Sequence, residues 1–384
     1  MRRPGFALVA ASTLALGIGA NTAMFSVADA VVFRSLPHRE PERLAMVWRE
    51  IPALNWTRGP NSYPKYADLR EQTRGFEDLA AFTNVAPVTV DAGGTPERVS
   101  RSQVSANLLA VLGNGALVGR TLVETDDAPG AELVVVVSEA YWRTRLGGAA
   151  DALGRTIRVE GEPHVVVGVM PADFAFPQAE VDLWTPLGAD AADLERDLSF
   201  LQLIGRLAPG VTMESAERDV AAVMDRLAEA YPHANEGVRL WVEPRHTFVV
   251  GDVRRILLVL QGAVALVLVI ACANLANLML ARGAARSREL AVRSALGAGR
   301  GRIVRQLLTE SGLIGLLGGV AGAAIAYTSS GVLRTFASFA LPRAETISVD
   351  GRALLFTAAI ALASGVLVGL VPALRAPGGG EVLR

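Results

Sequence analysis

The sequence predicts a membrane protein in which four transmembrane α-helices carry a large α+β extracytoplasmic domain, inserted between the first and second helices. Three observations support this fold class. Hydrophobic residues make up 51% of the chain and charged residues only 20%, whereas a soluble domain has about 25% charged residues. Four apolar stretches reach the length of about 20 residues that crosses a bilayer. Between the first two stretches, the range 34–252 has an ordinary globular composition.

The domain boundaries follow these apolar stretches along the chain. We expect a first transmembrane helix over 1–33, an extracytoplasmic domain over 34–252, a second helix over 253–281, a cytoplasmic segment over 282–306, a third helix over 307–333, a short extracytoplasmic loop over 334–352, a fourth helix over 353–374 and a cytoplasmic tail over 375–384. The alternative for the first stretch is a cleaved signal peptide. Its apolar pattern continues to Phe33, well past the about 7–15 residues of a signal-peptide core, so we expect an uncleaved anchor.

Arginines in the short flanks orient the helices. Arg2 and Arg3 precede the first stretch, seven arginines lie within 282–306, and Arg375 and Arg384 follow the fourth stretch. Because positive flanks face the cytoplasm, both termini are expected there. The range 34–252, with 32 acidic and 21 basic residues, then lies outside. The net charge of the whole chain is −1, which gives no indication of nucleic-acid binding.

The extracytoplasmic domain is expected to mix short β-branched strands with helices, in an order too irregular for a doubly wound sheet. The clearest helix is 212–231, because apolar residues recur on one face and Thr212 stands at its N-cap. The predicted strands are 85–91, 97–104, 133–138, 157–159, 164–170, 200–207 and 239–243, and the other predicted helices are 62–73, 105–112 and 138–146.

No residue pattern in the sequence indicates a catalytic or metal site, and we expect no enzyme activity, metal or cofactor. The single lysine, Lys65, has no glycine frame around it, so the chain contains no Walker A loop. The four histidines are scattered, and one cysteine excludes an internal disulfide. Any ATP hydrolysis must therefore come from another polypeptide.

Glycines four positions apart form three frames in the third and fourth apolar stretches. Such frames let helix backbones approach closely in a membrane. Glycine is common in transmembrane helices, but three frames together favour tight packing. No ladder of ionisable residues lies at mid-depth, which argues against a transporter with a midplane site. The frames consist of Gly315 with Gly319, Gly318 with Gly322, and Gly365 with Gly369.

The segment 282–306 combines seven arginines with one acidic residue, Glu289. A short helix is expected over 286–295, in which Glu289 can pair with Arg293 one turn later. The residues Leu296, Gly297 and Ala298 then break the helix. Residue chemistry alone leaves two interpretations open: the segment lies on anionic lipid, or it docks a cytoplasmic protein.

Five stretches of this chain together resemble MacB/FtsX-type ABC transporter permeases. They are 14–25 (LALGIGANTAMF), 166–171 (VVGVMP), 271–278 (ACANLANL), 288–298 (RELAVRSALGA) and 302–310 (RIVRQLLTE). The resemblance covers essentially the whole chain and is most similar to the acidobacterial duplicated orphan permeases. Members of that branch carry two such units, and this chain corresponds to one half-unit.

The resemblance implies a mechanotransmitter in the bacterial inner membrane, with a periplasmic core domain and a role in efflux. A cytoplasmic ABC ATPase would bind the segment between the second and third helices and rearrange the periplasmic domain by moving the first and second. The unit would work as a homodimer, or as a pseudo-dimer with a second four-helix unit, among membrane lipid. The alternative is an FtsX-like signalling protein that controls a periplasmic partner without transport. The expected ATPase-coupling contact consists of Arg288, Glu289, Arg293, Leu296, Gly297 and Ala298.

Overall fold

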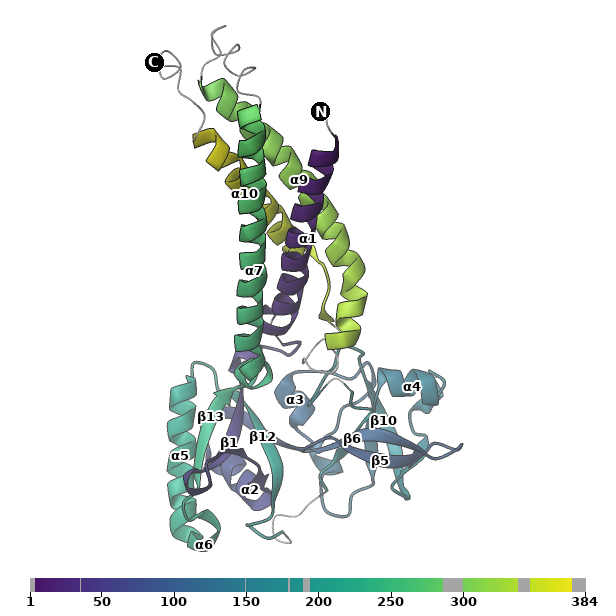
Figure 1. The fold of residues 1–384 in the computed structure, drawn as a ribbon. Helices are drawn as coiled ribbons and strands as arrows, with labels where there is room; N and C mark the ends of the chain where they lie inside the picture. Colours follow the sequence, from purple (N-terminus) through teal and green to yellow (C-terminus); the bar gives the residue numbers. More distant parts are fainter. Residues whose placement is uncertain are drawn as a thin grey trace. The chain divides into compact units, whose positions relative to one another are not determined.

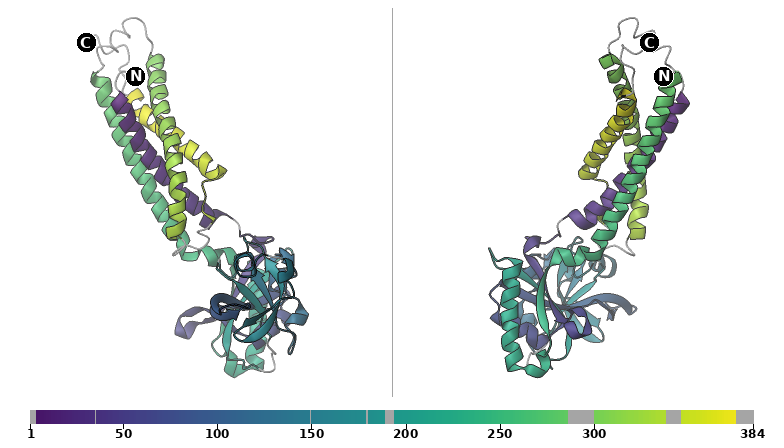
Figure 2. Two further views of the ribbon diagram at one scale, coloured as in Figure 1. Left: turned by 90° about the vertical axis from the view of Figure 1, so that its right-hand side faces the viewer. Right: turned by 60° about the vertical axis from the view of Figure 1, so that its left-hand side comes forward.

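The computed structural model describes residues 4–34, 36–148, 150–178, 180–188, 194–285, 300–337 and 346–374. The chain divides into two compact units (Figures 1 and 2). We call Met1–Arg34 together with Val250–Arg384 the helical unit, and Ser35–Val249 the α+β unit. The α+β unit is therefore inserted into the helical unit at a single place in the sequence.

Four long apolar helices make up the described part of the helical unit. Each contains a stretch that is long and apolar enough to cross a membrane: Ala7–Phe33, Val253–Ala281, Val304–Ala337 and Gly351–Leu370. The predicted fold class, four membrane helices with an α+β domain between the first and second, is confirmed. The helices are α1 (Pro4–Ala28), extended by one π-helical turn η1 (Asp29–Phe33), then α7 (Arg245–Ala285), α9 (Arg300–Ala337) and α10 (Gly351–Leu374).

The surface of these helices is apolar, as a lipid environment requires. Leu355 and Phe336 are both 73% exposed, and Val259 is 67% exposed. The α7 span is the least covered of the four, because only 17% of its most apolar window is buried, against 39–44% in the other three. The helix α7 also contains one non-helical residue, Gly251, at which the helix is kinked.

Within the described part of the α+β unit, thirteen strands form one sheet. One half is antiparallel, in the order β4-β12-β1-β13, with Trp48 of β1 opposite Trp241 of β13. Its bounds are β1 (Leu44–Ile51), β4 (Phe76–Thr83), β12 (Ser199–Leu207) and β13 (Arg239–Pro244), with β2 (Trp56–Gly59) beside β1 and β3 (Asn61–Ser62) beside β12.

The other half of the sheet closes on itself. The strand β11 pairs with β8 at one end of the order β11-β8-β10-β9-β5-β6 and with β6 at the other, so these six strands form a closed ring. The bounds are β5 (Ala86–Asp91), β6 (Glu97–Val104), β8 (Val134–Ser138), β9 (Thr156–Val159), β10 (Glu162–Met170) and β11 (Leu183–Pro186), with β7 (Val118–Gly119) beside β10.

The longest helix of the α+β unit buries one face against this sheet. In α5 (Met213–Ala230) the Thr212 hydroxyl accepts a hydrogen bond from Ser215 N at 3.2 Å, which caps the first turn. Ala216, Val220 and Val223 of α5 are buried in the core that covers the antiparallel half. The remaining helices are α2 (Tyr63–Gln72), α3 (Leu108–Leu112), α4 (Glu139–Arg145) and α6 (Pro232–Asn235), with short 3-10 turns at Pro41–Arg43, Pro52–Leu54, Glu124–Asp126 and Ala150–Ala152.

All seven predicted strands and all four predicted helices of the α+β unit are present, with ends shifted by up to three residues. The sequence analysis missed four strands of four or more residues that build the sheet: β1, β2, β4 and β11. The strand β1 has five consecutive buried residues, so it lacks the polar–apolar alternation of a half-exposed strand. The central strand β4 (FEDLAAFT) contains Ala, Leu, Glu and Asp, which have weak strand preference, and tertiary pairing overrides that preference.

Candidate functional site

The six residues expected to contact an ATPase lie outside the described residues. Arg288, Glu289, Arg293, Leu296, Gly297 and Ala298 all fall within 286–299. Their role stays a prediction from the sequence.

The glycine frame Gly315–Gly319 of α9 lies against α10. A methyl group on Gly315 would lie 2.8 Å from the carbonyl oxygen of Ala361, and one on Gly319 would lie 2.7 Å from the Cβ of the same residue. Non-bonded carbon atoms pack at about 3.5–4.0 Å, so neither position has room for a side chain. The two glycines therefore set the closest approach of α9 to α10.

The frame Gly318–Gly322 of the same helix lies against α1. A methyl group on Gly318 would lie 2.7 Å from Leu14 Cβ, and one on Gly322 would lie 2.9 Å from Gly19 N and 3.0 Å from Ala15 O. The helix α9 thus uses two neighbouring faces, one for each partner, and packs backbone against backbone on both.

The glycines of α10 face the same interface from the other side. A methyl group on Gly365 would lie 3.3 Å from Gly312 Cα and 3.3 Å from Ser311 O, and one on Gly369 would collide with the Ser311 hydroxyl. The six predicted packing glycines thus lie where three helices, α1, α9 and α10, approach one another. Beside them, a groove of about 600 Å³ on α9 and α10 is lined almost entirely by apolar side chains, which suits lipid acyl chains.

Two polar contacts join the helices inside the apolar region. The Asn21 side chain donates to Gly17 O at 2.9 Å and to Val264 O of α7 at 3.1 Å, and it accepts from Gln261 Nε2 at 3.2 Å. The hydroxyls of Thr22 and Thr357 lie 2.9 Å apart, which joins α1 to α10. Interhelical hydrogen bonds of this kind contribute about 0.6 kcal/mol each in a membrane protein. They serve helix packing, although the buried Oε1 of Gln261 has no hydrogen-bond partner among the described residues.

A cluster of four charged residues lies where η1 ends and α10 begins. The Arg34 guanidinium lies 3.1 Å from Asp29 and 2.6 Å from Asp350, and Arg352 lies 3.5 Å from Asp29. Asp350 also caps α10, because its Oδ1 accepts from the backbone N–H groups of Arg352 and Ala353 at 3.0 and 3.1 Å. Burial raises the pKa of Asp350, but the Ala353 N–H and the Arg34 charge outweigh that effect and hold the pKa below its usual value.

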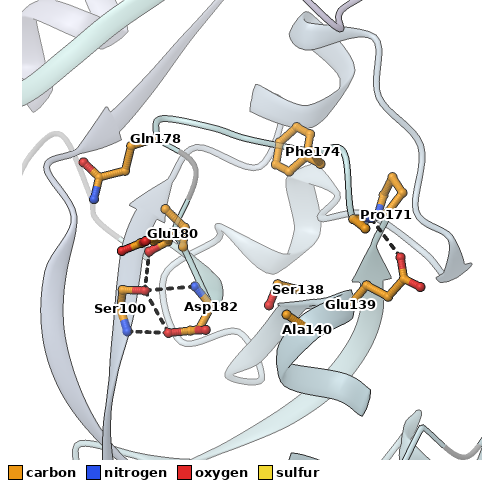
Figure 3. A pocket seen from close by; sticks show the side chains of 11 residues that line it. Ser100, Ser138, Glu139, Ala140, Pro171, Phe174, Gln178, Glu180 and Asp182 are labelled. Atoms are coloured by element: carbon orange, nitrogen blue, oxygen red, sulfur yellow. Dashed lines mark hydrogen bonds between the residues drawn. The ribbon is translucent and has the colours of Figure 1, made fainter. Parts of the chain in front are cut away.

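The α+β unit contains a polar pocket of about 490 Å³ on the closed ring (Figure 3). One wall is the segment 171–182, which links β10 to β11, and the other comes from Ser100 of β6 and from Ser138 and Glu139 at the start of α4. Asp182 Oδ2 accepts from the backbone N–H and lies 2.8 Å from the hydroxyl of Ser100. Glu139 accepts from Ala172 N at 2.9 Å. These contacts tie the two walls together.

Three carboxylates line this pocket: Glu139, Glu180 and Asp182. The Arg143 side chain pairs with Glu139 one helical turn away, so part of the negative charge is balanced. The remaining acceptor oxygens favour a cationic or hydrogen-donating group over an anion. Within the described residues, no group of three or more His, Cys, Asp or Glu side chains is arranged to hold a metal ion.

Sequence reasoning missed several buried cations of the α+β unit. Lys65 is 3% exposed, and burial, followed by the Arg49 charge, lowers its pKa to about 8. Arg206 is also 3% exposed and donates to Val111 O at 2.8 Å. Arg245, the first residue of α7, is 4% exposed. Charged residues are rarely buried in this way, and no local sequence pattern marks them.

Comparison with protein families gives two matches that together cover most of the chain. Residues 7–223 match the MacB-like periplasmic core domain, and residues 262–377 match the FtsX-like permease C-terminal region.

Among curated proteins, the chain is similar to the macrolide export ATP-binding/permease protein MacB of Chromobacterium violaceum, with 30% identity over 246 residues, which is 63% of this chain and 36% of that protein. It is also similar to the pyoverdine export ATP-binding/permease protein PvdT of Pseudomonas aeruginosa, with 27% identity over 256 residues, 65% of this chain and 36% of that protein. The chain thus spans about a third of the length of these relatives.

Among solved structures, a domain of a permease protein from Porphyromonas gingivalis gives a TM-score of 0.44 at 17% identity, over 54% of this chain and 92% of that chain. The periplasmic region of MacB from Actinobacillus actinomycetemcomitans gives a TM-score of 0.39 at 14% identity, over 54% of this chain and 90% of that chain.

Proposed function

Since this chain belongs to the family of MacB/FtsX-type permeases, we propose that it is the transmembrane subunit of an ABC transporter. In this proposal, a separate cytoplasmic ATPase drives a displacement of the membrane helices. The helices transmit it to the periplasmic α+β unit, which exports or extracts a substrate.

The insertion of the α+β unit between two membrane helices carries the proposal. The turn η1 ends at Phe33, one residue before the last residue of this part of the helical unit, Arg34, and α7 begins at Arg245, within the last residues of the α+β unit. Neither connection contains a run of glycine or serine residues, which supports the proposal that a displacement of α1 or α7 is passed on through the backbone. This connectivity suits mechanical transmission.

The names of the relatives support the export role and the need for ATP. They are called ATP-binding/permease proteins for macrolide or pyoverdine export. The present sequence contains no Walker A loop, and we propose that a separate ATPase subunit hydrolyses the ATP. No observation favours the alternative of a regulator without transport.

We assign the ATPase contact to Arg288, Glu289, Arg293, Leu296, Gly297 and Ala298, with both chain termini in the cytoplasm of a bacterial cell. The arginine-rich flanks support this orientation. We also propose that two four-helix units assemble. The low coverage of α7 supports a further helix partner for that helix.

Co-expression of the chain with ABC ATPases of the same organism, followed by co-purification, tests the function and the contact together. Charge reversal of either Glu289→Arg or Arg293→Glu is expected to abolish co-purification, because each places like charges one helical turn apart. The control is Arg254→Glu, which reverses an exposed arginine at the other end of the second span. If both variants still bind the ATPase, the contact assignment is wrong. If the wild-type chain binds no ATPase, with or without nucleotide, the proposed function is wrong.

A further inference from the structure

We propose that Arg245 is a positioning residue that fastens the start of α7 to the segment 171–182, so that a displacement of this helix changes the width of the acidic pocket. The source of the displacement rests on the proposed function. The link itself does not, because Arg245, the segment and the pocket all lie within the α+β unit.

The Arg245 side chain contacts the segment 171–182 in two ways: it forms one hydrogen bond with the backbone, and it lies against one aromatic ring. Its Nη2 donates to the carbonyl oxygen of Pro177 at 3.1 Å. Its guanidinium carbon lies 5.2 Å from the ring centroid of Phe176 and 5.4 Å from that of Phe248, so the group is held between two aromatic side chains. Phe248 belongs to the first turn of α7, whereas Phe176 belongs to the pocket segment.

The surroundings of Arg245 make a purely stabilising role a poor explanation. The side chain is 4% exposed, its Nε has no hydrogen-bond partner, and no carboxylate of the described residues forms an ion pair with it. Burial lowers its pKa to about 10. A buried charge without a counterion costs free energy, and an apolar side chain of similar volume often stabilises such a site better. What arginine adds here is a directed bond to one backbone carbonyl.

The segment that Arg245 contacts is joined at this point to neighbouring aromatic residues. The carbonyl oxygen of Phe176 accepts from Trp184 Nε1 at 2.9 Å, and its ring packs edge-on against Phe82 at 4.7 Å. Phe174, which lines the pocket, packs against Trp184 at 5.2 Å. The aromatic residues therefore move as a group, and a force on Pro177 is carried to the pocket wall.

The opposite wall is anchored elsewhere. Ser100 lies in β6, which pairs with both β5 and β11, and Glu139 begins α4. The hydrogen bonds between Asp182 and Ser100 hold the far end of the segment against that wall. The part that can shift is thus the stretch around Phe174 and Gln178 (Figure 3), on the side that Arg245 contacts.

Distance measurements between spin labels test the link in the full chain. Gln178→Cys and Thr247→Cys place labels at two exposed positions, one on the pocket segment and one in the first turn of α7, in a Cys272→Ser background in lipid nanodiscs. A second pair, Ala140→Cys with Gln178→Cys, spans the pocket. With Arg245 present, both distance distributions are expected to be narrow.

The variant Arg245→Met is expected to broaden both distributions at least about twofold, because the segment then opens locally while the rest of the unit stays folded. The matched control is Arg58→Met. Arg58 also faces the Phe248 ring, at 5.8 Å, but it pairs with Glu243 and has no contact with the segment. Intrinsic fluorescence checks folding, since all five tryptophans lie in the α+β unit. Should Arg245→Met fail to fold, Arg245→Lys replaces it, because lysine keeps the charge and lacks the planar fork.

Unchanged distributions in a folded Arg245 variant overturn the proposal, and so does an equal broadening in Arg58→Met. The experiment needs no ATPase and no nucleotide. A failure of the chain to bind an ATPase would therefore refute the proposed function and leave this result intact.

Discussion

Replacing Gly322 of α9 by alanine tests whether α9 and α1 are held together by backbone contact. The added methyl group would lie 2.9 Å from Gly19 N, 3.0 Å from Ala15 O and 3.1 Å from Ile18 Cβ. The first two are backbone atoms, which cannot rotate away as the end of a side chain does. The helices must separate by about 0.6 Å to restore a contact of roughly 3.5 Å.

The expected magnitude follows from a comparison with a second glycine of the same helix. Forcing a methyl group into a closely packed interface costs about 1–3 kcal/mol, whereas alanine in place of glycine stabilises a helix by roughly 0.5–1 kcal/mol. Gly331 has no atom within 4 Å of the position of an added methyl group, so Gly331→Ala gains the helix preference without the collision. The difference between the two variants is therefore the packing term alone, about 1–3 kcal/mol.

The assay is unfolding of the full chain in mixed micelles by increasing sodium dodecyl sulfate, followed by far-ultraviolet circular dichroism. Tryptophan fluorescence serves as an internal reference. All five tryptophans lie in the α+β unit, so their fluorescence follows this unit and not the helical unit. Gly322→Ala is expected to unfold at a lower detergent fraction than the wild-type chain, and Gly331→Ala at an equal or higher one. Equal midpoints for the two variants would refute close backbone packing at Gly322.

Two further predictions concern charged groups. Lys65→Met is expected to stabilise the α+β unit by up to about 3 kcal/mol at neutral pH, since a pKa of about 8 lies more than two units below that of an unfolded lysine. Between these two pKa values the unfolded state binds more protons than the folded state, so the stability of the wild-type chain rises with pH in this range. The variant is expected to lack that rise. Thermal melting followed by fluorescence at several pH values measures the difference. Asp350→Ala is expected to destabilise the helical unit by about 1 kcal/mol through loss of the α10 cap. Because the pKa of Asp350 is lowered, its own contribution is present above its unfolded pKa and is lost as the pH falls through its folded pKa. Detergent unfolding curves at neutral and acidic pH measure both effects, and a variant with wild-type midpoints at each pH would contradict the assignment.

Local signals predicted the elements that carry their own boundaries. The helix α5 was predicted to within one residue at each end, because Thr212 caps it and its apolar residues recur on one face. The strand β6 was predicted over its full length. In contrast, β1 and β4 depend on neighbours far along the chain: Met46 is paired with Ile204 and with Glu243. No pattern within the strand itself encodes such pairing.

The candidate site shows the same division between local and non-local information. Glycine spacing marked the frames Gly315–Gly319 and Gly318–Gly322, but it did not say which helix each would meet. The two frames are three positions apart, which is roughly 60° around a helix, so α10 and α1 contact adjacent faces of α9. The cluster of Arg34 with Asp29 and Asp350 joins residues more than 300 positions apart and had no signal in the sequence.

The contacts within the helical unit differ in stiffness, and that difference decides which helix can move. Shifting α9 along α1 or α10 drives backbone atoms into one another at the glycine frames, so these three helices are expected to move as one body. The helix α7 is held to α1 by the contact between Gly17 and Leu268 and by the hydrogen bonds of Asn21 with Gln261 and Val264, and it is the least covered of the four helices. Breaking one such hydrogen bond costs only about 0.6 kcal/mol. A force applied at the Ala285 end of α7 is therefore expected to displace α7 before it separates the other three helices, and α7 is the helix that begins at Arg245, beside the pocket segment.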